Sequence, residues 1–131
     1  MPSDPSTVFL RIVNEVLNHG RLDLLDELVA QDYVDHPGSE GREGYRETIS
    51  FVRGIFPDMH MTVHELIPGP DRVAARFTVE ATHQGEFMGI LATGKRVTWE
   101  GIGIIRVEDG KMVERWNVSD MLGLLEQIKG E

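Results

Sequence analysis

The spacing of apolar residues changes abruptly near Asp58, and this change limits the folds open to the chain. Before it, apolar residues recur at helical spacing and predict three amphipathic helices, over 5–19, 22–29 and 42–56. After it they alternate and predict four strands, over 59–66, 72–85, 96–107 and 112–120. A short helix over 121–128 is expected at the end, and the polar and aromatic stretch 32–38 is interpreted as a loop.

This order of elements predicts an α+β fold. Helices followed by hairpin-linked strands pack as a helical layer on one side of an antiparallel sheet. Strands of ten or more residues must twist, so the sheet is expected to curl around the three helices. A curled sheet closed by helices encloses a conical pocket.

The composition fits one domain spanning residues 1–131, with 40% hydrophobic residues and a core large enough to enclose a small cavity. The net charge of -9 argues against nucleic acid and anionic membranes as partners. The chain has no cysteine, which excludes a thiol nucleophile. Because no stretch approaches the ~20 apolar residues of a membrane span and no signal-peptide pattern is present, we expect a cytoplasmic protein.

Strand alternation assigns candidate side chains to faces. In 72–85, Phe77 and His83 share one face with an otherwise apolar row, so His83 could donate to or accept from a ligand oxygen. The alternative for His83 is a structural histidine with its own hydrogen bonds. In the last strand, Trp116 falls on the same side as Asp120, so Trp116 is expected to form a pocket wall.

Five segments carry a resemblance to a known family: FPD (56–58), VAARFT (73–78), THQGEF (82–87), TGK (93–95), and DGK (109–111) with the following Trp116 and Asp120. In this order they resemble the SnoaL-like polyketide cyclase family of the nuclear transport factor 2-like superfamily. The resemblance implies a cone-shaped α+β roll without a cofactor, a homodimer formed through the sheet, and a deep apolar pocket for a small or polycyclic organic ligand. Because the superfamily hosts several reactions, fold alone does not select one.

The resemblance also indicates site residues. In these cyclases an aspartate at the end of the last strand is the general acid/base of an intramolecular aldol closure, and Asp120 occupies the matching position. Burial on a hydrophobic wall would raise the pKa of Asp120 and suit it to proton transfer next to a carbonyl. The alternative is that Asp120 caps the final helix. His36 matches a histidine often seen in the family's loop after the early helices, where it would line the cavity mouth.

Aromatic residues complete the expected site. Trp99 and Trp116 offer flat apolar walls, and Tyr33 offers a pocket hydroxyl, with ordinary core packing as the alternative for each. The expected catalytic residues are therefore Asp120 and His83. The expected substrate-binding residues are His36, Tyr33, Phe77, Trp99 and Trp116.

The third strand argues against a complete catalytic site. Residues 101–105 are almost wholly apolar and supply no evident donor for an enolate oxygen, which leaves Arg106, His83 or a water for that role. The predicted function is cofactor-free cyclisation or isomerisation of a small hydrophobic carbonyl compound by acid/base catalysis. A non-catalytic domain that binds a hydrophobic ligand is the main alternative.

Two further enzymes of the same fold stay open. An epoxide hydrolase needs an Asp, Arg, Asp set, which would require Arg76 to point inward. A ketosteroid isomerase needs a tyrosine beside its base, and Tyr33 and Tyr45 are the only tyrosines. No metal is expected, because His60 and His64 lie roughly 13 Å apart along one strand, too far to share an ion.

Overall fold

The computed structural model describes residues 4–36, 38 and 41–130. The helix α1 (Pro5–Arg11) continues as a π-helical stretch over Ile12–Leu17, and a 3-10 turn over Leu22–Leu24 leads into α2 (Leu25–Leu28). The elements that follow are β1 (Val29–His36), α3 (Gly41–Ile55), β2 (His60–Pro68), β3 (Arg72–Thr82), β4 (Arg96–Glu108), β5 (Lys111–Ser119) and α4 (Met121–Lys129).

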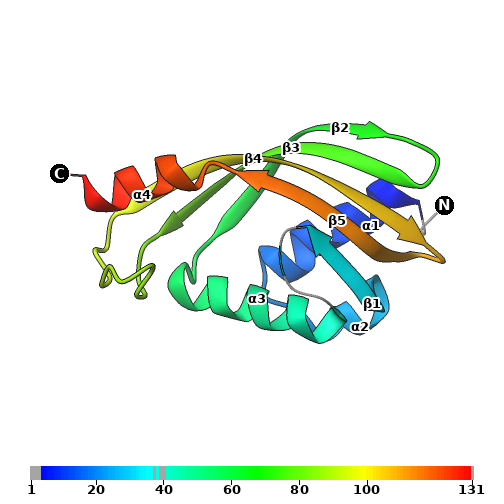
Figure 1. Cartoon of the computed structure of the whole chain (residues 1–131), viewed down its shortest axis with the longest axis horizontal. Helices are drawn as coiled ribbons and strands as arrows, with labels where there is room; N and C mark the ends of the chain where they lie inside the picture. The colour runs from blue at the N-terminus through cyan, green and yellow to red at the C-terminus, as the bar shows by residue number, and fades with distance from the viewer. Residues whose placement is uncertain (1–3, 37, 39–40, 131) are drawn as a thin grey trace.

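The five strands form one curled sheet in the order β1-β5-β4-β3-β2, and α1, α2 and α3 lie together on one side of it (Figure 1). Strands β2 to β5 pair antiparallel with their neighbours, and β1 pairs parallel with β5. The helix α4 follows β5 at the far end of the sheet (Figure 1). The predicted α+β class, with helices packed on a curled sheet and a short helix at the end, is confirmed.

The loop predicted over 32–38 is wrong for residues 32–36, which belong to β1. Tyr33 and Asp35 face the core and are buried, whereas Gln31 and Asp32 are exposed. The strand was missed because this short edge strand carries charged and polar residues, and its pairing with β5 comes from residues about 80 positions away. As a result the sheet is mixed and not purely antiparallel. Residue 37 lies outside the described residues.

Two hydrophobic clusters fill the space between sheet and helices. The first joins α1, α2 and β1 to one end of the sheet, around Val16, Leu25 and Met112. The second joins the end of α3 to β3, β4 and α4, around Phe56, Val79 and Leu124. Within the described residues, no helix is both long and apolar enough to cross a membrane.

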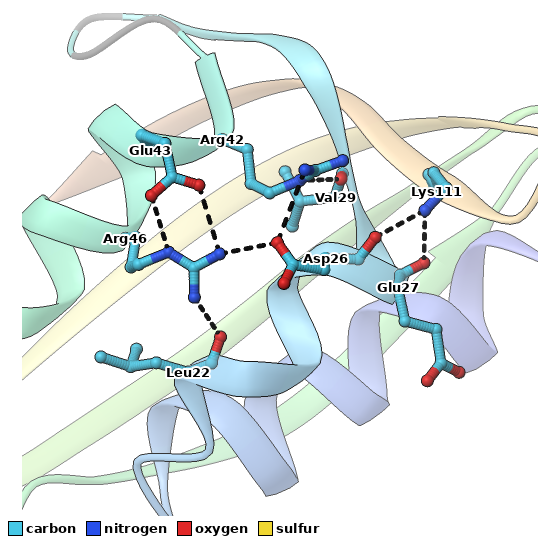
Figure 2. Close-up of polar contacts among 8 residues, drawn as sticks. All are labelled: Leu22, Asp26, Glu27, Val29, Arg42, Glu43, Arg46 and Lys111. Carbon is cyan, nitrogen blue, oxygen red and sulfur yellow. Dashed lines mark hydrogen bonds and ion pairs between the residues drawn. The ribbon is translucent and has the colours of Figure 1, made fainter.

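Polar contacts fix the first half of α3 against α2 (Figure 2). Arg46 donates to the Leu22 carbonyl over 2.6 Å and to the Asp26 carboxylate over 2.8 Å. Arg42 donates to the Val29 carbonyl over 2.9 Å, at the junction of α2 and β1. Hydrogen bonds from charged groups contribute more than neutral ones, so these contacts hold the start of α3 against α2 and the beginning of β1.

Candidate functional site

A cavity of about 190 Å³ lies between α3 and the concave face of the sheet and is partly open to solvent. Its lining is mainly apolar and includes Ile49 from α3, Phe77 and Val79 from β3, and Trp99 from β4. A smaller cavity of about 30 Å³ shares Phe77 with it, together with Tyr45 and Arg115, and lies on the side of α1. A cavity with this lining suits an apolar ligand whose few polar atoms are matched by specific side chains.

The polar wall of the cavity comes from α3 and β5. Tyr45 and Thr48 face it from the helix, and Arg115, Asn117 and Ser119 face it from the strand. These three strand residues pair with Ile105, Gly103 and Gly101 of β4. Although residues 101–105 of β4 are apolar, the cavity has hydrogen-bond donors, because β5 supplies them.

A β-bulge in β5 decides which residues face the cavity. Val107 pairs with Met112, but Arg106 pairs with Glu114, so Val113 is an extra residue. One added residue moves every later side chain to the opposite face. The prediction that Trp116 shares the cavity face is wrong for this reason.

Two glycines of β4 make room for this wall. A Cβ on Gly101 would lie 2.4 Å from Phe77 Cζ and 2.8 Å from Ser119 Oγ, and one on Gly103 would lie 3.0 Å from Asn117 Oδ1. Cβ atoms essentially never lie closer than 3.0 Å to a non-bonded heavy atom, and 3.0 Å is itself a tight contact. The glycines at 101 and 103 therefore let Phe77 and the polar side chains of β5 occupy the concave face.

Arg115 is held by a buried carboxylate. Its Nη1 donates to Asp35 Oδ2 over 2.9 Å, and the Asp35 side chain is only 6% exposed. The Arg115 guanidinium also lies over the Tyr45 ring, 5.7 Å from its centre. Burial lowers the pKa of Arg115, but the groups of Tyr45, Tyr33 and Asp35 outweigh it and raise the pKa overall. Arg115 is therefore a permanent cation in the cavity wall.

The two tyrosines beside Arg115 stay protonated. Tyr33 and Tyr45 pack with ring centres 5.0 Å apart, and burial raises the pKa of both hydroxyls. Tyr45 lines the cavity, whereas Tyr33 is fully buried behind it. Of the two, Tyr45 is the one placed to offer a hydroxyl donor to a ligand.

Asp120 lies outside the cavity. Its Oδ1 accepts from the backbone N–H of Gly123 over 2.9 Å, so it caps α4. A Cβ on residue 123 would meet this carboxylate, which explains the glycine there. Asp120 is exposed and lines a shallow depression on the convex face of the sheet, together with Arg76 and Glu100. The cap alternative is confirmed.

The other predicted site residues are split between the two faces of the sheet. Phe77 and Trp99 line the cavity. His36 and Trp116 stack on each other, with ring centres 5.1 Å apart, and neither lines it. His36 Nε2 pairs instead with Glu114 Oε2 over 2.8 Å, and this hydrogen bond lowers the pKa of Glu114. His36 and Trp116 therefore belong to the side of the sheet away from the helices.

His83 is fully buried at the end of β3, on the concave side as alternation predicted. Its Nδ1 accepts from the Thr93 backbone N–H over 3.3 Å and lies 2.9 Å from Thr93 Oγ1. Among the residues that the structure describes, none is a hydrogen-bond partner of its Nε2. His83 is not among the cavity-lining residues, and its contacts fasten the segment 83–95 to the sheet.

Other arrangements that the sequence left open are not assembled. Arg76 is exposed and pairs with Glu65 over 3.3 Å, so it does not point into the cavity as an epoxide hydrolase site would need. Within 4–36, 38 and 41–130, no group of three or more histidine and carboxylate side chains is arranged to hold a metal ion.

Comparison with known proteins assigns the family. The model of the SnoaL-like polyketide cyclase family matches residues 7–128. The chain belongs to this family. Among curated relatives of this SnoaL-like chain, the aklanonic acid methyl ester cyclase DnrD of Streptomyces peucetius is 26% identical over 126 residues, covering 91% of this chain and 87% of DnrD. The nogalonic acid methyl ester cyclase of Streptomyces nogalater is 26% identical over 120 residues, covering 85% and 87% of the two chains.

Solved structures of SnoaL-like proteins match the whole fold. IdmH of Streptomyces antibioticus, a proposed polyketide cyclase, superposes with a TM-score of 0.86 at 34% identity, covering 96% of this chain and 99% of IdmH. AclR of Streptomyces galilaeus, a proposed hydroxylase, superposes with a TM-score of 0.83 at 33% identity, covering 94% and 93%. The SnoaL-like fold therefore carries more than one proposed activity among similar chains, and the reaction has to be argued from the cavity.

Proposed function

We propose that this SnoaL-like protein binds a hydrophobic carbonyl compound of the polyketide ester type in its cavity and promotes intramolecular aldol cyclisation without a cofactor. The observation that carries this proposal is the apolar cavity with one polar wall, formed by Arg115, Asn117 and Ser119. The named curated relatives act on methyl esters of aklanonic and nogalonic acid, which supports the ligand class. The cavity is smaller than the ~300–1,000 Å³ of typical ligand sites, so part of a polycyclic ligand would lie in its open mouth.

The reaction needs one proton removed and one returned. A base takes the proton from a carbon next to a carbonyl, and the enolate carbon attacks a second carbonyl carbon of the same molecule. One C–C bond forms, and the new alkoxide oxygen takes up a proton, so nothing is oxidised or reduced. No carboxylate is among the described residues that line the cavity, and we propose that water entering through the open mouth carries the proton.

Product analysis tests the proposal. The protein would be incubated with aklanonic acid methyl ester and with nogalonic acid methyl ester, and the ring-closed isomer, which has the same mass, would be separated by chromatography. We expect cyclisation of at least one ester at least 100-fold faster than in buffer or with heat-unfolded protein. Rates equal to those in buffer for both esters, and for further esters of this class, would contradict cyclase activity.

A binding domain without catalysis is the second candidate. It is favoured by one observation, the lack of a carboxylate among the described residues that line the cavity. A binding domain would take up the same esters, with affinity measurable by calorimetry, and would leave their structure unchanged. Tight binding without ring closure would therefore replace the cyclase proposal with this one.

We also propose that two copies of the chain associate through the convex face of the sheet. Ile102, Ile104 and Val118 are exposed there by 58%, 38% and 77%. They belong to the adjacent strands β4 and β5, where Ile102 pairs with Val118. Contiguous exposed apolar side chains on a sheet are typical of an interface, and a second copy would cover them.

A further inference from the structure

Arg115 is the one positively charged side chain among the described residues that line the two cavities. It borders both of them, where the larger cavity meets the smaller. Its side chain is 25% exposed although its Asp35 partner is almost fully buried. Because Arg115 lines both cavities and its side chain is not fully covered, a bound ligand can reach it.

We propose that Arg115 binds the carbonyl oxygen of the ligand and stabilises the negative charge that this oxygen carries as an enolate. The inference rests on the proposed function, because an enolate forms only if the protein handles a carbonyl compound. A guanidinium has five N–H donors, and its hydrogen bond to Asp35 uses Nη1. Tyr33 is a second polar neighbour of the guanidinium, and the donors left over are available to a ligand oxygen at the polar end of an otherwise apolar cavity.

The charge of Asp35 determines which oxygen suits this site. In the free protein the pair of Arg115 and Asp35 is close to neutral, so the site does not attract a carboxylate ligand strongly. A ketone or ester oxygen enters without a charge and becomes negative only as the proton leaves carbon. Fixed donors that interact more strongly with the developing enolate than with the neutral carbonyl lower the barrier to proton removal. Donors that bind both states equally well do not.

Packing keeps the guanidinium in place before a ligand arrives. The Asp35 bond fixes one nitrogen, and the Tyr45 ring lies against the guanidinium. Tyr45 is in turn packed on Tyr33, and both lie in the core. An arginine fixed in this way loses little further freedom on binding a ligand, which favours electrostatic stabilisation.

The stabilisation of a negatively charged oxygen by Arg115 can be measured with a bound naphthol, without any turnover. 2-Naphthol has an apolar ring pair and one oxygen that becomes negative on ionisation, as an enolate oxygen is, and its ionisation is visible by absorbance. Naphthalene has the same rings without the oxygen and reports whether the cavity is intact. Both would be bound to the wild type, Arg115→Lys and Arg115→Met, with affinity from calorimetry and the pKa of bound 2-naphthol from a pH titration.

We expect the wild type to lower the pKa of bound 2-naphthol below that of the free compound. Arg115→Met should bind naphthalene within about twofold of wild type but lose this lowering, and Arg115→Lys should keep part of it. An unchanged pKa of bound 2-naphthol in Arg115→Met would overturn the proposal, as would no lowering in the wild type. If the lowering depends on Arg115 while no ester is cyclised, the oxyanion site stands and the cyclase proposal fails.

Discussion

At the scale of single residues, Asp120 shows how one carboxylate can suit two roles by position alone. It follows the last strand, where a proton carrier was expected, but its carboxylate bonds the Gly123 amide at the start of α4. A helix N-terminus leaves several N–H groups without partners, and an aspartate side chain satisfies one of them. Its position therefore serves the fold, and we predict that chemistry in the cavity does not require its negative charge.

The variants Asp120→Asn and Asp120→Ala separate the two roles. Asparagine caps a helix about as well as aspartate but cannot carry a proton, so Asp120→Asn should keep both stability and ester turnover within about twofold. Asp120→Ala removes the cap and should lower the free energy of unfolding by about 0.5–2 kcal/mol. Urea unfolding and turnover, measured on the same preparations, check both. Loss of turnover in Asp120→Asn with unchanged unfolding would return Asp120 to the mechanism.

Residue roles were predictable from sequence only where alternation was undisturbed. Along β3, a plain two-residue period placed Phe77 and His83 on the concave side, where the structure has them. Along β5, the same reasoning selected Trp116 and missed Arg115, because Val113 is an extra residue. Nothing in the local sequence marks this bulge, since it is defined by the register in which β5 pairs with β4.

At the scale of elements, the connection between α3 and β2 is fastened to the sheet by one carboxylate. Asp58 accepts from the Thr82 backbone N–H over 2.8 Å and from Thr82 Oγ1 over 2.7 Å, and pairs with Arg96 over 2.9 Å. The hydrogen bond from the Thr82 hydroxyl is the main cause that lowers the pKa of Asp58 below its ordinary value of 3.8. The Asp58 side chain therefore links the α3–β2 connection to both β3 and β4.

This carboxylate predicts a pH dependence of stability. Because the pKa of Asp58 is lower in the folded protein than in the unfolded chain, its contribution is complete above about pH 5. It is lost as the pH falls through the lower folded value. Asp58→Asn should therefore show a smaller drop in urea midpoint between pH 6 and pH 3 than wild type, and Thr82→Val should give an intermediate drop. A drop in Asp58→Asn as large as that of wild type would contradict this assignment.

Element types were more predictable than their pairing. The helix α3 and strands β2 to β5 appear where periodicity placed them, because each buries a regular apolar stripe. The strand β1 was missed, since Asp32, Asp35 and His36 interrupt any apolar pattern and its partner β5 lies far along the chain. This strand nevertheless brings Asp35 to Arg115, so the error in one element hid the buried carboxylate that holds the arginine of the cavity wall.

At the scale of the whole molecule, the two faces of the sheet are expected to have different functions, ligand binding on the concave face and association on the convex face. The concave face and α3 enclose the cavity, and the convex face exposes Ile102 and Val118 beside the stacked His36 and Trp116. Association through the convex face would leave the mouth of the cavity open. Ligand binding and association are therefore expected to be separable by mutation.

The proposed dimer can be tested with a charge placed on one face. Val118→Lys puts an ammonium on the convex face and should shift the protein from dimer to monomer in light scattering, with unchanged helical content. Phe51→Lys is the matched control, because Phe51 is 64% exposed on α3, on the other side of the molecule. A wild-type monomer at micromolar concentration would contradict the proposal, as would a dimer insensitive to Val118→Lys.

Ligand entry between α3 and the sheet is central to both the proposed function and the proposed role of Arg115. Thr48 is exposed at the edge of this cavity and lines it, and Ser50 is exposed on the same helix without lining it. The decisive measurement is the affinity for 2-naphthol of Thr48→Trp, which would obstruct the mouth, compared with that of Ser50→Trp. We predict at least tenfold weaker binding for Thr48→Trp and wild-type binding for Ser50→Trp, whereas equal affinities of the two variants would contradict the assignment of the cavity.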